Sequence, residues 1–277
     1  MTPQREIMKK ILTSILVIAC FLSSKADGAV ERIRSPEEIT YEWLVDLGTT
    51  TAYTDHVPHF KKIFEHLKVK TFLEFGVGYS TKYFLDSSKK VISVEFVTHG
   101  YGPSWIMECI DLYHDYSNWI PLIYFTGFKG DTDWAQYKYL GSEHVYKAVS
   151  YQTVTHKNYA LIDDFYLNEL NAFISNLVKC YNINVAFVDS GLYLRGDLVQ
   201  LSFNKIPVIV AHDTTVRALG QTGDVYGYSR IVTPENYEEI FIQHGQGTTV
   251  WIIKTDPYKK LTEEIKKYAS DIRNSSN

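Results

Sequence analysis

The sequence predicts an α/β protein with a doubly wound, mostly parallel seven-stranded sheet that ends in an antiparallel β-hairpin. Three observations lead to this fold class. From residue 70 onward, short apolar runs alternate with amphipathic stretches; a glycine-containing turn follows the first run; and a short glycine-containing connection separates the last two runs. Alternating strands and helices are typical of a parallel sheet covered on both faces, and a short connection of this kind is typical of a hairpin.

The chain is long enough for one sizeable core. Its 277 residues are 45% hydrophobic and 22% charged, which is ordinary for a folded protein. We expect a single domain over residues 69–277, preceded by a helical lead-in over residues 27–68, where Ser35-Pro36-Glu37-Glu38 has the composition of a helix start.

The elements of the domain follow one another in βαβ order. In the first half we expect strands over residues 71–75, 91–95 and 120–125, with helices over residues 80–88 and 104–116. In the second half we expect helices over residues 166–181 and 194–204, strands over residues 185–189 and 207–213, hairpin strands over residues 239–243 and 248–254, and a polar helix from Tyr258. An irregular insertion over residues 127–159 separates the halves, and loops of this length are usually functional or disordered.

The first 26 residues differ from the rest. A basic stretch ending in Lys9 and Lys10 precedes the apolar run Ile11–Leu22, which predicts a signal peptide. The run is shorter than the ~20 apolar residues that a membrane-spanning helix requires. A retained membrane anchor is therefore only the alternative to a signal peptide. Cleavage after Ala26 competes with lipidation of Cys20. We expect an exported protein, periplasmic, secreted or lipid-anchored, which contacts the membrane only through this segment.

The charge of the chain argues against nucleic acid as a partner. Residues 1–26 hold four of the 28 Lys and Arg residues and one of the 32 Asp and Glu residues, so the remainder carries a formal charge near −7. Phosphate binding depends on clustered basic side chains, which this balance does not offer.

A Gly-x-Gly turn lies where the first strand leads into the first helix. Gly76 and Gly78 would let the backbone approach a ligand closely, and the helix N-terminus after Ser80 offers free N–H groups. A dinucleotide fingerprint requires a third glycine where this chain has Thr81, so a hydride-transfer enzyme is disfavoured. Glu95 ends the second strand, and an acid about 20 residues beyond such a turn commonly binds ribose hydroxyls.

Three further polar residues end the fourth and fifth strands. Asp189, His212 and Asp213 would meet Glu74 at the carboxyl edge of the sheet, because neighbouring strands lie ~4.8 Å apart. Strand alternation predicts that only one of His212 and Asp213 faces the site. All three are candidate catalytic residues, with His212 as a candidate base. Asp189 and Asp213 are also candidate Mg²⁺ ligands; alternatively, Asp189 only neighbours the cofactor and Asp213 caps a turn.

Together these segments resemble class I S-adenosylmethionine-dependent methyltransferases over residues 70–254. The resemblance rests on Glu74-Phe75-Gly76-Val77-Gly78, on Phe187-Val188-Asp189-Ser190-Gly191 followed by Arg195-Gly196-Asp197-Leu198, and on His212-Asp213-Thr214. It implies a Rossmann-like methyltransferase fold that binds S-adenosyl-L-methionine, in some relatives together with Mg²⁺. The residues it implies for the cofactor are Glu74, Gly76, Gly78, Ser80, Glu95 and Asp189. Some members have a histidine shortly after the fourth strand, but Ser190-Gly191-Leu192-Tyr193 supplies none, so the resemblance does not imply a histidine-based step there.

The resulting hypothesis is O-methylation of a small-molecule or glycan-linked acceptor, selected by the 127–159 insertion. Two alternatives stay open. One is a non-catalytic exported interaction domain on the same fold, since S-adenosylmethionine is made in the cytosol. The other is a sugar-nucleotide glycosyltransferase with Asp131-Thr132-Asp133 as its metal-binding carboxylates. Homodimerisation is open as well.

Overall fold

The computed structural model describes residues 35–51, 53–97, 103–125, 164–190, 195–220 and 226–275. The strands are β1 (Thr71–Phe75), β2 (Lys90–Val97), β3 (Trp119–Phe125), β4 (Val185–Val188), β5 (Val208–His212), β6 (Tyr237–Ile242) and β7 (Thr248–Ile253). The helices are η1 (Pro36–Glu38), α2 (Tyr41–Thr51), α3 (Val57–His66), α4 (Thr81–Ser87), α5 (Pro103–Tyr113), α7 (Asp164–Tyr181), α8 (Arg195–Ser202), α9 (Thr215–Ala218), η4 (Tyr228–Arg230) and α10 (Asp256–Ser275). The expected signal segment and the 127–159 insertion lie outside the described residues.

The seven strands form one sheet in the order β3-β2-β1-β4-β5-β7-β6. All neighbours are parallel except β7, which runs antiparallel to both β5 and β6. The expected fold class is therefore confirmed, including the C-terminal hairpin. The strand order reverses between the neighbouring strands β1 and β4, because the chain crosses from β3 at one edge back to β4 beside β1. In open α/β sheets such a switch point is where ligands bind.

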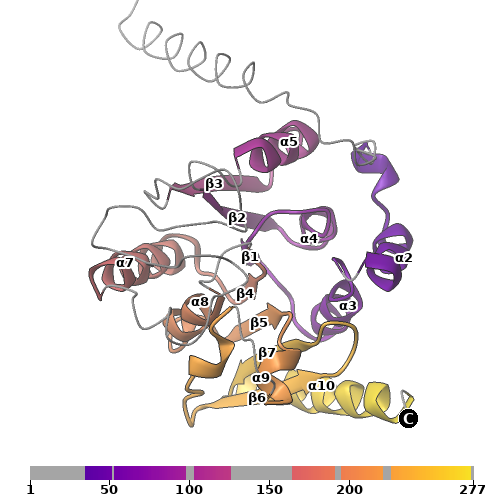
Figure 1. The fold of residues 1–277 in the computed structure, drawn as a ribbon, viewed down its shortest axis with the longest axis vertical. Helices are drawn as coiled ribbons and strands as arrows, with labels where there is room; N and C mark the ends of the chain where they lie inside the picture. The colour runs from indigo at the N-terminus through magenta and orange to yellow at the C-terminus, as the bar shows by residue number, and fades with distance from the viewer. Residues whose placement is uncertain are drawn as a thin grey trace, which may run out of the picture. The chain divides into compact units, whose positions relative to one another are not determined.

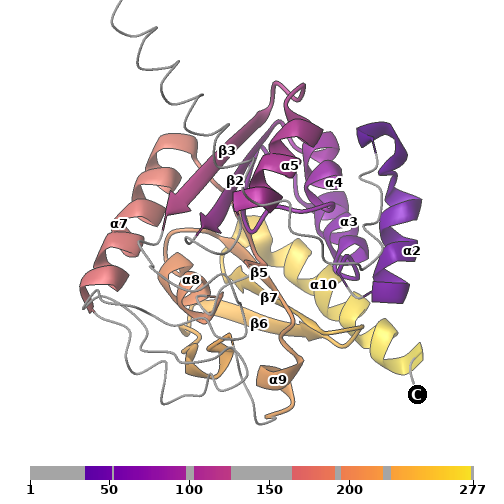
Figure 2. The same ribbon diagram turned by 45° about the horizontal axis from the view of Figure 1, so that its top comes forward.

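Helices cover both faces of the sheet (Figures 1 and 2). On one face α7 and α8 pack on the sheet, with Leu170, Ile174 and Leu198 against the buried side chains of Leu73 and Phe75. On the other face lie α2, α3, α4, α5 and α10, in a second apolar cluster centred on Phe60, Phe72, Phe84, Phe187 and Ile265. The central strands β1, β4 and β5 are buried on both faces, which explains why they are continuous apolar runs.

The register of β1 determines where the polar residues of the site meet. Phe75, the last residue of β1, pairs with Val94 on one side and with Val188 on the other. The residues that follow these three positions, Gly76, Glu95 and Asp189, therefore lie side by side at the carboxyl edge. None of the helices in the described part of the chain combines the length and apolar character that a membrane span requires.

Candidate functional site

The turn after β1 holds its shape only with glycine at its first position. Gly76 has φ of +101°, and its N–H donates to the carbonyl oxygen of Val94 at 2.9 Å. A Cβ atom at Gly76 would lie 2.4 Å from the carbonyl oxygen of Asp189. The turn is pressed against the end of β4, which only a residue without a side chain allows.

Side chains from β2 and α5 hold the rest of the turn. The N–H of Val77 donates to Oε2 of Glu95 at 2.9 Å, and the indole N–H of Trp105 donates to the carbonyl oxygen of Val77 at 2.7 Å. The hydroxyl of Tyr113 donates to the carbonyl oxygen of Gly78 at 3.1 Å. The turn is thus held by hydrogen bonds from side chains of β2 and α5.

Glu74 lies beneath the turn rather than at its surface. Its side chain is fully buried, and its Oε1 accepts hydrogen bonds from the hydroxyls of Ser93 and, at 2.9 Å, of Thr81, which itself accepts the N–H of Gly78. Burial raises the pKa of Glu74 to about 8. The predicted cofactor residue therefore shapes the turn from below through Thr81. Ser80 is buried at the N-cap position of α4.

Glu95 is the best-placed of the predicted cofactor residues. It follows the stretch of β2 that pairs with β1, and it lies next to the turn through its contact with Val77. Only 3% of the residue is exposed, and this burial raises the pKa of its carboxyl to about 7. A carboxylate at this place has the position expected for a ribose-binding acid.

A second group of charged residues lies at the carboxyl ends of β4 and β5. The guanidinium of Arg195 lies between two carboxylates, with Nη1 2.8 Å from Oδ1 of Asp189 and 2.6 Å from Oδ2 of Asp213. Its Nε donates to the carbonyl oxygen of Ser190 at 2.6 Å, and its guanidinium carbon lies 3.9 Å from the ring centroid of Tyr226. Sequence reasoning assigned Arg195 no role.

This arrangement bears on the expected Mg²⁺ site. The two predicted ligands, Asp189 and Asp213, do come together, but the buried cation between them is Arg195. Mg²⁺ requires near-octahedral oxygen ligands and retains several waters. A pair of carboxylates already joined by a guanidinium does not fit a resident Mg²⁺ ion, and no catalytic step is derived through one.

The expectation that only one of His212 and Asp213 faces the site is wrong. Nδ1 of His212 lies 3.5 Å from Oδ1 of Asp189 and 3.6 Å from Oδ1 of Asp213, so the side chains of His212 and Asp213 meet beside Asp189. Strand β5 ends at His212, and Asp213 has φ of +59°. The left-handed backbone turns the side chain of Asp213 back toward the site, where strand alternation no longer applies.

The other side of His212 contacts a residue from outside the predicted site. Its Nε2 pairs with Oδ1 of Asp55, in the turn between α2 and α3, and Oδ2 of Asp55 accepts the N–H of Gln246 at 2.9 Å. Burial alone would lower the pKa of His212, but the facing carboxylates of Asp189, Asp55 and Asp213 raise it to about 10. Burial alone would raise the pKa of Asp55, and its contact with His212 reverses this and lowers it.

His56 completes this group. It is fully buried, with its ring centroid 4.5 Å from that of Phe187 and 4.8 Å from that of His212. Neither of its ring nitrogens has a hydrogen-bond partner among the described residues. Burial lowers the pKa of His56 to about 3. The pattern Asp55-His56-x-x-His59 was visible in the sequence, but nothing local connects it with β5.

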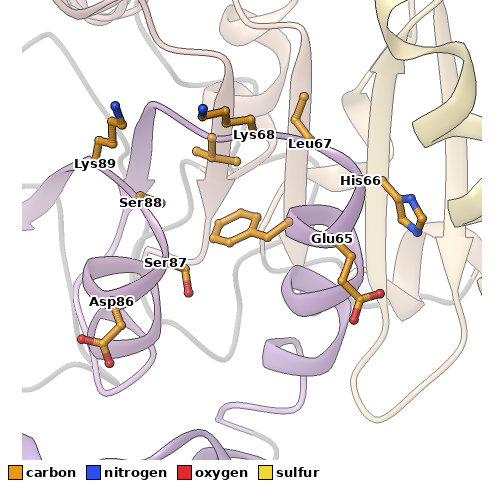
Figure 3. A pocket seen from close by; sticks show the side chains of 10 residues that line it. Glu65, His66, Leu67, Lys68, Asp86, Ser87, Ser88 and Lys89 are labelled. Carbon is orange, nitrogen blue, oxygen red and sulfur yellow. The ribbon is translucent and has the colours of Figure 1, made fainter.

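A cavity of about 570 Å³ lies at the opposite, amino edge of the sheet. Figure 3 shows its lining, which comes from the last residues of α3 and α4 and the segments leading into β1 and β2. It contains none of the residues discussed above. Because ligands of open α/β sheets bind at the carboxyl edge, we place the functional site there and not in this cavity.

No protein-family model matches the chain, and no curated protein is significantly similar in sequence. Among solved structures it is similar to the SAH-bound methyltransferase PaMTH1 of Podospora anserina, at 12% identity and a TM-score of 0.43 over 92% of this chain and 98% of that one. It is also similar to an O-methyltransferase of Bacillus cereus in complex with SAH, at 12% identity and a TM-score of 0.43 over 87% and 97%. Spermidine synthase of Thermotoga maritima matches at 14% identity and a TM-score of 0.34 over 72% and 58%.

These similarities extend over most of each methyltransferase chain but are too weak to assign an activity. The fold follows from the chain's own geometry: a Gly-x-Gly turn after β1, a switch point between β1 and β4, and β7 inserted antiparallel between β5 and β6. The described part of the chain has the Rossmann-like fold of class I methyltransferases.

Proposed function

We propose that this protein is an S-adenosylmethionine-dependent methyltransferase that methylates a hydroxyl oxygen. One observation carries the proposal. At the switch point of the sheet, the glycine turn lies against the end of β4, where Asp189 begins the second charged group, and the buried carboxyl of Glu95 accepts the N–H of Val77 in the same turn. This places a nucleoside-binding edge next to a group of carboxylates that can bind an acceptor.

The residues around the turn suit the cofactor. The backbone at Gly78 is open to close approach, because no atom lies within 4 Å of a Cβ built on it, whereas Gly76 lies against the end of β4. Glu95 would accept hydrogen bonds from the ribose hydroxyls, while Glu74 acts indirectly by holding Thr81 under the turn. When bound, S-adenosylmethionine supplies a methyl group on a positively charged sulfur.

The acceptor would lie against Asp189 and Asp213. Their side chains are 21% and 24% exposed, whereas that of His212 is only 4% exposed. Both ring nitrogens of His212 already face carboxylates, Nε2 toward Asp55 and Nδ1 toward Asp189. His212 is therefore a positioning residue in this proposal rather than the base that the sequence suggested.

Methyl transfer then requires little further chemistry. With S-adenosylmethionine bound, the acceptor oxygen would take up the methyl group, and Asp189 or Asp213 would accept the hydroxyl proton. Arg195 holds these two carboxylates in place and balances their charge. The main contribution of the protein is the alignment of oxygen, carbon and sulfur.

The acceptor class and the location remain parts of the proposal. A small-molecule or glycan-linked hydroxyl suits a site lined by carboxylates, and the acidic net charge of the chain disfavours nucleic acid as the acceptor. Export through residues 1–26, with the membrane reached only through them, is supported by their sequence pattern. N-terminal sequencing of the mature protein tests cleavage, and its native mass tests homodimerisation.

Turnover tests the activity itself. The full-length chain is incubated with S-adenosylmethionine and a panel of hydroxyl acceptors, and formation of S-adenosylhomocysteine is measured. Asp213→Asn should lower the turnover number on the order of 100-fold or more, in the range expected for loss of a general base, with cofactor affinity unchanged. If a folded chain binds the cofactor but methylates no acceptor, the catalytic proposal is overturned in favour of a binding domain.

A further inference from the structure

A second possible ligand site lies behind the acceptor face. Asp55, His56 and His212, which we call the Asp55–His56–His212 cluster, each offer one ligand atom, and these atoms all lie within 4.8 Å of one another. All three residues are at least 97% buried. Two residues come from the turn between α2 and α3 and one from the end of β5, so the cluster joins the helical lead-in to the sheet.

His56 provides the independent observation that points to a ligand. Its two ring nitrogens are buried, and neither has a hydrogen-bond partner among the described residues. A buried polar group without a partner is destabilising, and most buried polar groups in folded proteins are satisfied. The ring lies 4.8 Å from that of His212, so a metal ion between them would satisfy one of these nitrogens.

The surroundings of the cluster resemble the outer shell of a metal site. Oδ2 of Asp55 accepts the N–H of Gln246 at 2.9 Å, which fixes the carboxylate and leaves Oδ1 directed at His212. Nδ1 of His212 lies 3.5 Å from Oδ1 of Asp189. Metal-binding histidines almost always donate their second nitrogen to a carboxylate or carbonyl in this way.

We propose that the Asp55–His56–His212 cluster binds a divalent transition metal ion of the zinc class. Two imidazoles and one carboxylate suit Zn²⁺, whereas Mg²⁺ prefers oxygen ligands and water. The site is distinct from the Mg²⁺ site predicted between Asp189 and Asp213, where Arg195 lies. Because all its residues are buried, the metal would act by joining the α2–α3 turn to the end of β5.

Metal titration of the full-length chain tests the proposal. After removal of metal with a chelator, Zn²⁺ is titrated by calorimetry, and Co²⁺ is added as a spectroscopic probe of ligand type and geometry. We expect one Zn²⁺ per chain and a melting temperature roughly 5–10 °C higher at saturation. Visible absorption by Co²⁺ should indicate a low coordination number with nitrogen and oxygen ligands.

Four variants locate the site. His56→Gln and His212→Gln should each weaken Zn²⁺ binding at least about 100-fold, more than the usual 10- to 100-fold loss for an outer-shell partner such as Asp189→Asn. His59→Gln is the matched control, because His59 is also a buried histidine with an unpartnered Nε2 but lies outside the cluster. It should retain wild-type affinity.

The outcomes decide the question even if a variant unfolds. Wild-type chain that binds no Zn²⁺, or binds it through thiolates as judged by the intense charge-transfer bands of Co²⁺, overturns the proposal and leaves the cluster as an ion pair of His212 with its carboxylates. Equal affinity of His56→Gln and wild type overturns it as well. Loss of binding in His56→Gln together with retention in His59→Gln supports it.

Discussion

The two halves of the carboxyl edge are built in different ways. The β1/β2 half consists of the glycine turn, Glu74 and Glu95, all within a short stretch of chain, and burial raises the pKa values of its two acids. The β4/β5 half brings together Asp55, Asp189 and Arg195 with His212 from distant parts of the chain, and here the acids are paired with cations. The first half is shaped by local sequence and burial, the second by tertiary contacts and charge pairing.

The largest effect is expected in the β4/β5 half. Arg195→Met leaves the carboxylates of Asp189 and Asp213 facing each other without their shared cation, so the free energy of unfolding should fall by about 3–5 kcal/mol. Urea unfolding of the full chain measures this change. The control is Lys254→Met, which removes a half-exposed lysine 3.6 Å from Glu238 and should change stability by less than about 1 kcal/mol. Equal losses in the two variants would contradict the charge-pairing role.

The next effect concerns the shape of the turn. Gly76→Ala forces a side chain onto a backbone with φ of +101° and into the carbonyl oxygen of Asp189. We expect a stability loss of roughly 3 kcal/mol, at the upper end for a strained backbone, together with loss of cofactor binding. Gly78→Ala is the matched control, since a Cβ there meets no atom within 4 Å, and it should be neutral or slightly stabilising. A neutral Gly76→Ala variant would show that the turn tolerates a side chain.

The third effect concerns the contribution of Glu95 to cofactor binding in the β1/β2 half. Glu95→Gln should weaken S-adenosylmethionine binding by roughly 1–3 kcal/mol if the carboxylate accepts the ribose hydroxyls. Because burial raises the pKa of Glu95 to about 7, wild-type affinity should fall as the pH is lowered through 7, whereas the variant should lose this dependence. Glu108→Gln, on the exposed side of α5, is the control and should bind as wild type does. Unchanged affinity in Glu95→Gln would remove the ribose assignment.

The last effect is a slope in stability with pH, which accumulates over several pH units. Burial raises the pKa of Glu74 to about 8 from an ordinary value of 4.5, so the folded chain keeps a proton that the unfolded chain releases. Stability should therefore fall by about 1.4 kcal/mol for each pH unit between 4.5 and 8. Glu74→Gln should remove this contribution in urea unfolding series across the range. A slope that is identical in the variant would show that Glu74 titrates normally.

The same contrast explains what the sequence could predict. Strand β1 was expected and found over residues 71–75, and the contact of Glu95 with the turn follows from the pairing of β1 with β2. The sheet order and the hairpin follow from element alternation and a short glycine-containing connection. These features depend on nearby residues and on rules for parallel sheets.

The β4/β5 half could be predicted only in part. Its strand-end residues Asp189, His212 and Asp213 were identified, but Asp55 meets His212 across 157 residues, and no periodicity connects a turn between two helices with a strand so far along the chain. The orientation of Asp213 depends on its left-handed backbone, which is unusual for a residue other than glycine and not specified by local pattern. Arg195 begins a helix, and its sequence position gives no sign of the two carboxylates it joins.

The most direct test is calorimetric titration of S-adenosylmethionine into the full-length chain, at pH 8 and pH 6, with and without Mg²⁺. A cofactor-binding β1/β2 half predicts one molecule bound per chain on the order of micromolar affinity at pH 8, weaker binding at pH 6, and no requirement for Mg²⁺. Absence of binding by a chain shown to be folded would contradict it and favour a non-catalytic interaction domain on this fold.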